Sequence, residues 1–429
     1  MRVRRAGSRT RGGHRLVAAV LAATLAAAGC VRSDGRSEPG GESGPVTLVT
    51  GRESNGYLRG LLEAWNAGHP RERATLVQLP EAADEVRAQL AAGLAGGSDR
   101  FDVLNLDVVW TAEFASRHWI TPLDGPDPVE VGGLLPQAVE TGRYDGRLYA
   151  VPLVANVGLL YYRSDLLAQA GEQPPATWAE LERLATEVAP RYGVDGYAGQ
   201  LLPYEGLTVN VAEAVQSAGG RFLDGQGGVA VDGTGYRHAL DFLAGGVRKG
   251  WIPRKALTYR EEESREAFRD GRLLFLRGWP SVHPSAAAPD SSVAGRFGVV
   301  PLPGPQGPGT GVLGGSDLAV NSASRHQRTA RELIRFLTGR EMQVRALAEA
   351  GQPPARADLY SDPAVVGRFP YLPVVRRELE TAVARPAVPE YQQLSLAISA
   401  DSYQVLLGRS GTDEAARRLA ADLKDVLNK

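Results

Sequence analysis

The chain has 429 residues, 43% of them hydrophobic and 23% charged, which is enough apolar material for two or three domains with buried cores. Its 48 basic and 49 acidic side chains nearly cancel, which argues against a nucleic-acid-binding protein. The single cysteine excludes a disulfide framework and a cluster of metal-binding thiolates.

The first 29 residues have the pattern of an export signal. Six arginines and no acid occur within residues 1–15, and the apolar run 16–28 that follows is too short to span a membrane. The only cysteine, Cys30, comes directly after Ala-Ala-Gly, which resembles the processing site of bacterial lipoproteins, where the cysteine carries the lipid (palmitate) anchor. The Arg4-Arg5 pair leaves open whether export follows the general or the twin-arginine route.

Residues 30–44 have no apolar period and are rich in glycine, serine and charged side chains. This composition predicts a flexible tether. We therefore expect a folded body held by a lipid at the extracellular face of a bacterial cell membrane.

The body alternates strands and helices. Strands at 46–50, 74–79 and 101–106, with helices between them, give a βαβαβ order that predicts a parallel sheet with right-handed crossovers. Further strands are predicted at 158–162, 273–276, 297–300 and 317–320. Helices are predicted between and after them, at 177–188 (opened by a Thr177/Glu180 capping box), 207–218, 236–248, 261–270, 325–338, 341–349, 371–383, 391–407 and 412–427.

The sequence offers little for catalysis. The histidines that follow the signal are scattered, and neither a nucleophile elbow nor a phosphate-binding loop occurs. The stretch 309–314 matches GxGxxG, but it precedes a predicted strand instead of joining a strand to a helix, so we expect a flexible loop there. We expect no cofactor and no metal ion.

Two residues that follow predicted strands are candidates for binding. The carboxylate of Asp107 can accept hydrogen bonds from two neighbouring sugar hydroxyls, and the indole of Trp279 can stack on a pyranose. The alternatives are that Asp107 caps a helix at 110–117 and that Trp279 packs in the core. The acidic run 261–263 would ordinarily be a solvated first turn of a helix.

Six segments in this order resemble the extracellular solute-binding proteins (family 1) of sugar ABC transporters, most closely the trehalose/maltose-binding lipoproteins. The resemblance extends over nearly all of 45–429. The segments are DVLNLDVVWTAEFASRHWITPL (102–123), VPLVANVGLLYYRSDLL (151–167), YEGLTVNVAEAVQSAGG (204–220), FLRGWP (275–280), LGGSDLAVN (313–321) and RPAVPEYQQLSL (385–396).

The resemblance implies an α/β fold with two lobes of the periplasmic-binding-protein type, each a sheet flanked by helices, with a hinge between them and a helical C-terminal tail. The N-terminal lobe would take residues 45–154 and 314–365. The C-terminal lobe would take residues 155–313 and 366–429.

The resemblance also implies a function. The protein would be a monomer that captures a disaccharide, trehalose before maltose, between the lobes and delivers it to permease subunits, and it would not be an enzyme. The family's sugar-binding positions correspond here to Glu53, Asp107, Asn156, Glu205, Glu261, Trp279, Gly315 and Arg385. The sequence departs from the family at Ser316, where an aromatic platform is common, and at Gly278, beside Trp279.

Two alternatives remain at this point. The protein could bind another solute, such as an oligosaccharide or a glycerophosphodiester, or it could be an exported glycosidase. A glycosidase would need two carboxylates at a defined separation across the scissile bond.

Overall fold

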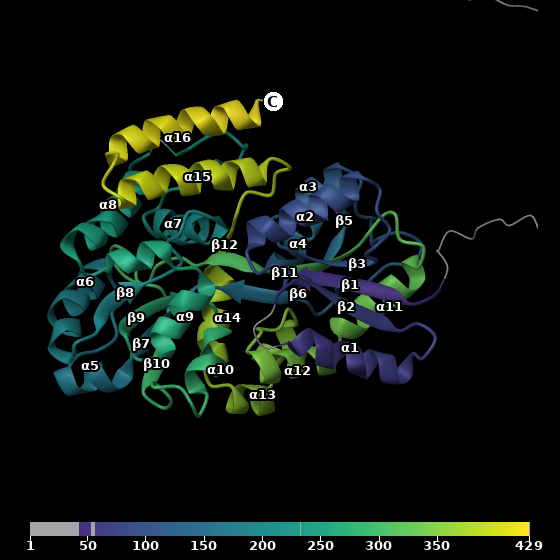
Figure 1. Ribbon diagram of the computed structural model, residues 1–429, viewed down its shortest axis with the longest axis horizontal. Helices are drawn as coiled ribbons and strands as arrows, with labels where there is room; N and C mark the ends of the chain where they lie inside the picture. Colours follow the sequence, from purple (N-terminus) through teal and green to yellow (C-terminus); the bar gives the residue numbers. More distant parts are fainter. Residues whose placement is uncertain (1–42, 53–55, 232, 429) are drawn as a thin grey trace, which may run out of the picture. The chain divides into compact units, whose positions relative to one another are not determined.

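The computed structural model describes residues 43–52, 56–231 and 233–428 (Figure 1). The export signal, Cys30, most of the tether and Glu53 therefore lie outside the described residues. The described residues all belong to one compact unit, Pro39–Lys429. Within the described part of the chain, every helix is too short or too polar to cross a membrane.

The first sheet contains the three parallel strands expected from the βαβαβ order. Its hydrogen-bonded order is β12 (Val383–Ala384), β11 (Val312–Val320), β3 (Val103–Asp107), β1 (Val46–Gly51) and β2 (Ala74–Leu79), and β6 (Ala150–Val157) also pairs with β11. Strand β1 runs parallel to β2 and to β3, which confirms the prediction. Strand β11 is antiparallel to both β3 and β6.

Helices cover this sheet with the apolar faces that their period predicts. In α1 (Tyr57–Gly68), the side chains of Leu58, Leu61 and Trp65 are buried in the core cluster that also contains residues of β1 and β11. The other helices and short strands along this part of the chain are α2 (Ala83–Ala95), α3 (Thr111–Ser116), α4 (Pro136–Thr141), β4 (Arg143–Tyr144), β5 (Arg147–Leu148), α11 (Gln327–Leu337) and α12 (Arg340–Ala350).

The second sheet has the order β10 (Phe297–Val300), β7 (Leu159–Arg163), β9 (Leu273–Gly278) and β8 (Asp195–Ala198). Only β8 and β9 are parallel, and β7 is antiparallel to β9 and β10. Its helices are α5 (Ser164–Ala170), α6 (Trp178–Glu187), α7 (Glu205–Ser217), α8 (Thr234–Lys249), α9 (Glu261–Arg269) and α10 (Val282–Ala287). The capping box of Thr177 and Glu180 forms at the start of α6 as predicted.

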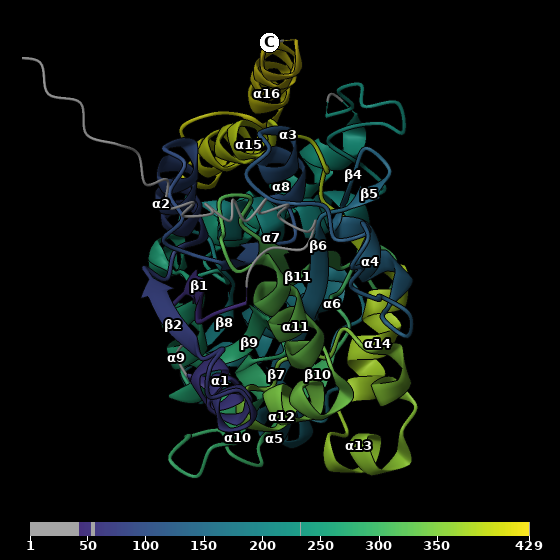
Figure 2. The same cartoon turned by 90° about the vertical axis from the view of Figure 1, so that its right-hand side faces the viewer.

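The C-terminal region is helical, as expected. Figure 2 shows α15 (Tyr391–Leu406) and α16 (Thr412–Leu427) above the two sheets, and α15 packs against α7, α8 and α16. They follow α13 (Pro363–Arg368) and α14 (Leu372–Thr381). Tyr391 belongs to a core cluster formed with residues of β1 and β3, so this region also contacts the first sheet.

The expectation of a flexible loop at 309–314 is wrong for its second half. Residues 312–314 begin β11, and Gly314 and Gly315 pair with Asn156 and Ala155 of β6. A Cβ at Gly315, whose φ is 127°, would lie 2.0 Å from the carbonyl oxygen of Val154. Glycine is therefore required at position 315 for the close approach of the two strands.

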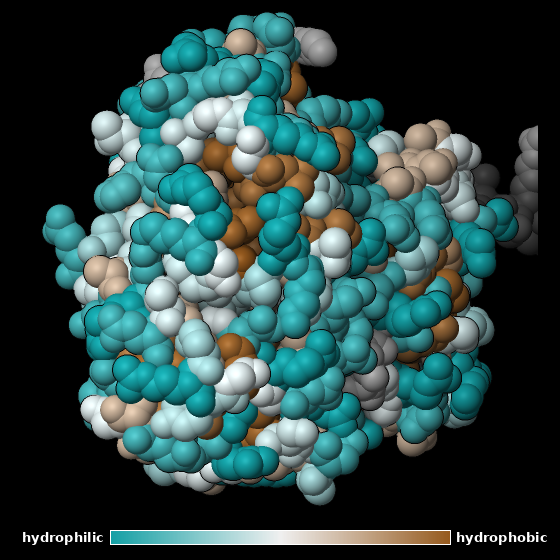
Figure 3. Space-filling model, turned by 60° about the vertical axis from the view of Figure 1, so that its left-hand side comes forward, coloured by the Kyte–Doolittle hydropathy of each residue, from teal (hydrophilic) through white to brown (hydrophobic). Residues whose placement is uncertain are grey.

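The face of the molecule in Figure 3 is mostly polar, with hydrophobic side chains in a few hollows. Among the described residues, the exposed large hydrophobic ones are Val383 and Leu396.

One acidic side chain lies inside the first sheet. Asp317 of β11 is fully buried, and burial raises the pKa of its carboxyl to about 8. The Thr141 hydroxyl oxygen lies 2.7 Å from the carbonyl oxygen of Ala138 and 2.9 Å from Oδ2 of Asp317. The single hydroxyl proton serves only one of these contacts, and a protonated Asp317 supplies the proton for the other.

This geometry predicts how stability depends on pH. Between the ordinary pKa of 3.8 and about 8, the folded state holds a proton that the unfolded state has released, so the free energy of unfolding falls as pH rises. The contribution is about 1.4 kcal/mol per pH unit. Asp317→Asn should remove that slope, measured by denaturant unfolding at pH 5 and pH 7.5. Equal slopes in the variant and the parent protein would contradict this assignment.

Candidate functional site

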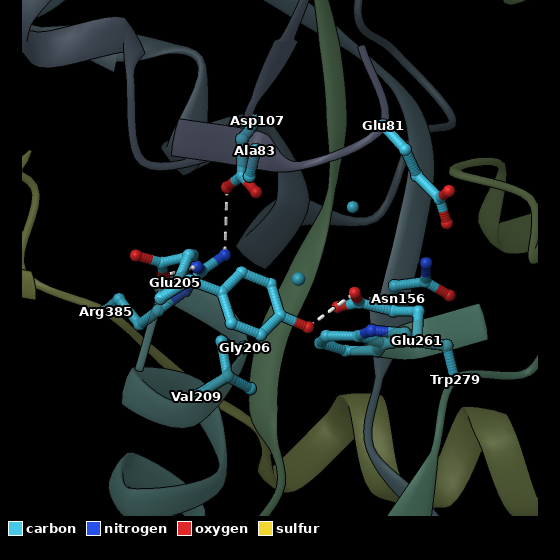
Figure 4. Close-up of a pocket in the computed structure, with 13 residues that line it drawn as sticks. Glu81, Ala83, Asp107, Asn156, Glu205, Gly206, Val209, Glu261, Trp279 and Arg385 are labelled. Carbon is cyan, nitrogen blue, oxygen red and sulfur yellow. Dashed lines mark hydrogen bonds and ion pairs between the residues drawn. The ribbon is translucent and has the colours of Figure 1, made fainter. Parts of the chain in front are cut away.

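A cavity of about 220 Å³ lies where the ends of strands from both sheets meet the first turns of two helices (Figure 4). Asp107 ends β3, Asn156 lies near the end of β6, and Trp279 directly follows β9. Glu205 and Glu261 are the first residues of α7 and α9. The complete lining is Glu81, Ala83, Asp107, Asn156, Tyr204, Glu205, Gly206, Val209, Glu261, Trp279, Gly314, Gly315 and Arg385.

The predicted binding residues within the described part of the chain all line this one cavity. They are Asp107, Asn156, Glu205, Glu261, Trp279, Gly315 and Arg385. Glu53 lies outside the described residues, and its role stays a prediction. Ser316 pairs with Asp107 in the sheet but does not line the cavity.

Glu81 and Tyr204 also line the cavity, although neither was predicted from the sequence to bind ligand. A signal existed for Glu81, because it follows β2 just as Asp107 ends β3, and parallel strands bring their carboxyl ends to one edge of the sheet. No comparable signal existed for Tyr204. Its place in the lining depends on the packing of its ring and on the hydrogen bond from its hydroxyl to Glu261.

Arg385 binds two carboxylates from different parts of the fold. Its Nη2 donates to Oδ1 of Asp107 at 3.0 Å, and its Nη1 donates to Oε1 of Glu205. The guanidinium and Glu205 are both buried. Glu205 also accepts hydrogen bonds from Tyr391 at 2.6 Å and from Ser395 at 2.5 Å, so its oxygens are satisfied within the protein.

Burial and neighbouring charges shift the pKa values of Arg385 and Glu205 in opposite directions. Burial alone would lower the pKa of Arg385, but the negative charges of Asp107 and Glu205 hold that pKa above its usual value. Burial raises the pKa of Glu205, against the opposing effect of the guanidinium. Arg385 therefore stays charged, and its ion pairs with Asp107 and Glu205 hold the guanidinium in place at one end of the cavity.

Asp107 keeps a free face toward the cavity. Its Oδ1 accepts the hydrogen bonds of Arg385 and of the Val109 backbone N–H, the latter at 3.2 Å. The N-cap of α3 is Trp110, without a side-chain cap, so the alternative in which Asp107 caps this helix is wrong. Asn156 adds a buried Oδ1 that has no hydrogen-bond partner in the described structure. A ligand hydroxyl would satisfy that oxygen.

The other end of the cavity combines a carboxylate with aromatic rings. Glu261 is half-buried and accepts a hydrogen bond of 2.5 Å from the Tyr204 hydroxyl, and burial raises its pKa. Trp279 is also half-buried, packed against the core on one side and lining the cavity on the other. Partial burial, and then the charges of Glu262 and Glu261, raise the pKa of Glu81.

The chemistry of the lining is that of a hydroxyl-binding site. Four carboxylates, one guanidinium, one amide and a tryptophan face the same space. Carboxylates accept hydrogen bonds from hydroxyls, and the excess of acids disfavours an anionic ligand. In the described residues, no group of three or more histidine, cysteine, aspartate or glutamate side chains could hold a metal ion.

Comparisons with known proteins agree with this fold and site. The model of the bacterial extracellular solute-binding proteins matches residues 51–344, and the chain belongs to that family. It is 33% identical over 377 residues to a probable ABC transporter-binding protein of Deinococcus radiodurans, covering 85% of this chain and 89% of that protein.

Two solved structures are similar along most of their length. Maltose-bound MalE3 of T. maritima has a TM-score of 0.85 and 32% identity, covering 89% of this chain and 99% of that one. The GacH receptor of Streptomyces glaucescens, solved unliganded and with acarbose, has a TM-score of 0.83 and 25% identity, covering 90% and 99%. These relatives confirm the two-lobe α/β fold and a binding protein instead of an enzyme.

The contacts of Arg385 lead to a testable prediction. Arg385→Met leaves Glu205 buried without its counter-charge, and the free energy of unfolding should fall by about 3 kcal/mol. Adding Glu205→Gln removes that uncompensated charge, so the double variant should recover part of the loss. Denaturant unfolding measures Arg385→Met, Glu205→Gln and the double variant. A loss in the double variant equal to the sum of the two single losses would show that the two side chains do not interact.

Proposed function

We propose that this protein captures a disaccharide in the cavity and delivers it to the permease subunits of an ABC importer. One observation carries the proposal: a half-buried indole, four carboxylates and a guanidinium held by two of them line the same cavity. Membership in the solute-binding family supports it, and so does the maltose bound to a relative that is 32% identical.

Each group would have a distinct role in binding. Trp279 would stack on the apolar face of one pyranose, and Glu261 and Asp107, at opposite ends of the cavity, would accept hydrogen bonds from sugar hydroxyls. Arg385 would donate to ligand oxygens through the Nε atom that has no partner in the described structure. Asn156 and the backbone at Gly315 would complete the polar contacts, and Glu53 would add a carboxylate.

Trehalose fits the arrangement better than maltose. The cavity has acids at both ends: Asp107 and Glu205 at the Arg385 end, and Glu81 and Glu261 at the Trp279 end. A disaccharide with two equivalent, non-reducing rings presents similar hydroxyls to both ends. Its compactness suits a cavity of about 220 Å³.

A longer sugar is the second candidate. A neighbouring cavity of about 340 Å³ shares Glu81, Glu261 and Trp279 with the first, and its other lining includes Ser281 and Ser285. Pockets for small ligands measure roughly 300 to 1,000 Å³, and the two cavities together lie inside that range. The adjoining space would accommodate further sugar rings of an oligosaccharide. A phosphodiester is disfavoured for a different reason, because the carboxylates would repel its negative charge.

Closure of two lobes would enclose the sugar. We assign residues 45–154 and 314–365 to one lobe and residues 155–313 and 366–429 to the other. A hinge between them would let the permease distinguish the loaded form from the empty one.

Titration calorimetry tests the ligand. Trehalose should bind with a Kd in the micromolar range or lower, about −8 kcal/mol, and maltose at least tenfold more weakly. Trp279→Ala should weaken trehalose binding by about 2 to 4 kcal/mol, since stacking and buried area are lost. Maltotriose binding as tightly as trehalose would assign the site to oligosaccharides, and binding of none of the three would refute the proposed function.

The membrane anchor is tested separately. We propose that Cys30 carries the lipid that holds the protein at the extracellular face of the membrane. Cys30→Ser should release the protein into the medium or leave its signal unprocessed, as fractionation and mass spectrometry would show. A Cys30→Ser protein that still carries lipid in the membrane fraction would disprove this anchor.

A further inference from the structure

A buried ion pair lies behind the cavity. Arg277 of β9 is 1% exposed and Glu213 of α7 is 4% exposed. The guanidinium donates Nε–H to Oε2 of Glu213 at 2.7 Å and Nη2–H to Oε1 at 2.5 Å, and its Nη1 donates to Gln200 at 2.9 Å. Because removing two charges from water offsets most of their attraction, a buried ion pair contributes little net stability. A further role of this pair would then lie in its contacts.

The ion pair lies directly against the backbone of Gly158, where a side chain would not fit. Gly158 is the one residue between β6 and β7, where the chain passes from one sheet to the other. A Cβ there would lie 2.1 Å from Oε1 of Glu213 and 2.8 Å from Nη2 of Arg277. The crossing therefore needs glycine because the ion pair occupies the space of a side chain.

The guanidinium lies against the tryptophan of the cavity. Cζ of Arg277 is 4.0 Å from the ring centroid of Trp279, within cation–π distance. The Tyr161 hydroxyl donates to the carbonyl oxygen of Trp279 at 2.9 Å, which fixes the backbone but not the ring. A Cβ at Gly314 would meet the ring edge at 2.9 Å, so that side is closely packed as well.

We propose that Arg277 is a positioning residue for sugar binding, which holds the Trp279 indole at the angle that presents it to the ligand. Arg277 does not line the cavity itself, so it acts through Trp279. Glu213 in turn fixes the guanidinium with two parallel hydrogen bonds. This inference rests on the proposed function, in which Trp279 stacks on the sugar.

The test removes both charges together. Arg277→Met with Glu213→Gln leaves no unpaired buried charge, so the double variant should keep its melting temperature within a few degrees. Disaccharide affinity should fall about tenfold, as expected for the loss of a desolvated cation–π contact that orients the ring. Arg277→Lys, which keeps the charge but not the planar fork, should be intermediate.

Labelling with 5-fluorotryptophan reports on the ring directly. The ¹⁹F resonance of Trp279 is identified by its loss in Trp279→Phe. In the double variant without ligand, this resonance should shift and broaden, while those of Trp65, Trp110 and Trp119, which pack around the first sheet, stay in place. The control is Arg163→Met with Asp165→Asn, which removes a second ion pair whose residues lie outside the cavity lining. This control should leave sugar affinity and the Trp279 resonance unchanged.

The outcomes separate the inference from the proposed function. A folded double variant with parental affinity and an unmoved Trp279 resonance overturns the positioning role. A parent protein that binds no sugar refutes the proposed function, while the resonance still reports whether Arg277 orients the ring. If the double variant does not fold, Arg277→Lys takes its place, because it keeps the buried charge paired with Glu213, and a smaller shift of the same resonance and a smaller loss of affinity are expected.

Discussion

The buried guanidinium of Arg385 between Asp107 and Glu205 is the contact on which the cavity depends. Asp107 ends a strand of the first sheet, Glu205 begins a helix beside the second, and Arg385 follows the edge strand β12. A charge buried so deeply needs counter-charges, and here these come from distant parts of the chain. The same ion pairs that satisfy Arg385 therefore bring together the segments that line the cavity.

The ion pairs of Arg385 also determine which ligand the site favours. Glu205 is fully engaged by Arg385, Tyr391 and Ser395, so its charge mainly balances the guanidinium. Asp107 retains acceptor capacity, and Asn156 has a buried oxygen without a partner in the described structure. A neutral molecule with many hydroxyls can satisfy these atoms without adding charge, whereas an anion would meet the surplus of carboxylates. On this reasoning the site selects for a sugar.

Much of the fold followed from local patterns, and the exceptions have physical causes. The period of α1 and the capping box before α6 depend on neighbouring residues, so the sequence alone predicts them. Strand β6, a buried run that contains a proline, and the glycine-rich start of β11 have no such signature, because their pairing is set by close backbone approach. Asp107 and Trp279 were candidates because they follow predicted strands, and the other predicted binding residues came from family resemblance. Glu81 carried the same strand-end signal, whereas the contact of Arg277 with Trp279 depends on three-dimensional packing that no short motif records.

A crystal structure of the protein with trehalose tests the central claim most directly. We expect one pyranose stacked on Trp279 and sugar hydroxyls within hydrogen-bond distance of Asp107, Asn156 and Glu261. The ion pair between Arg385 and Glu205 should remain intact. A sugar bound elsewhere, or in this cavity without contact to Trp279 and Asp107, would contradict it.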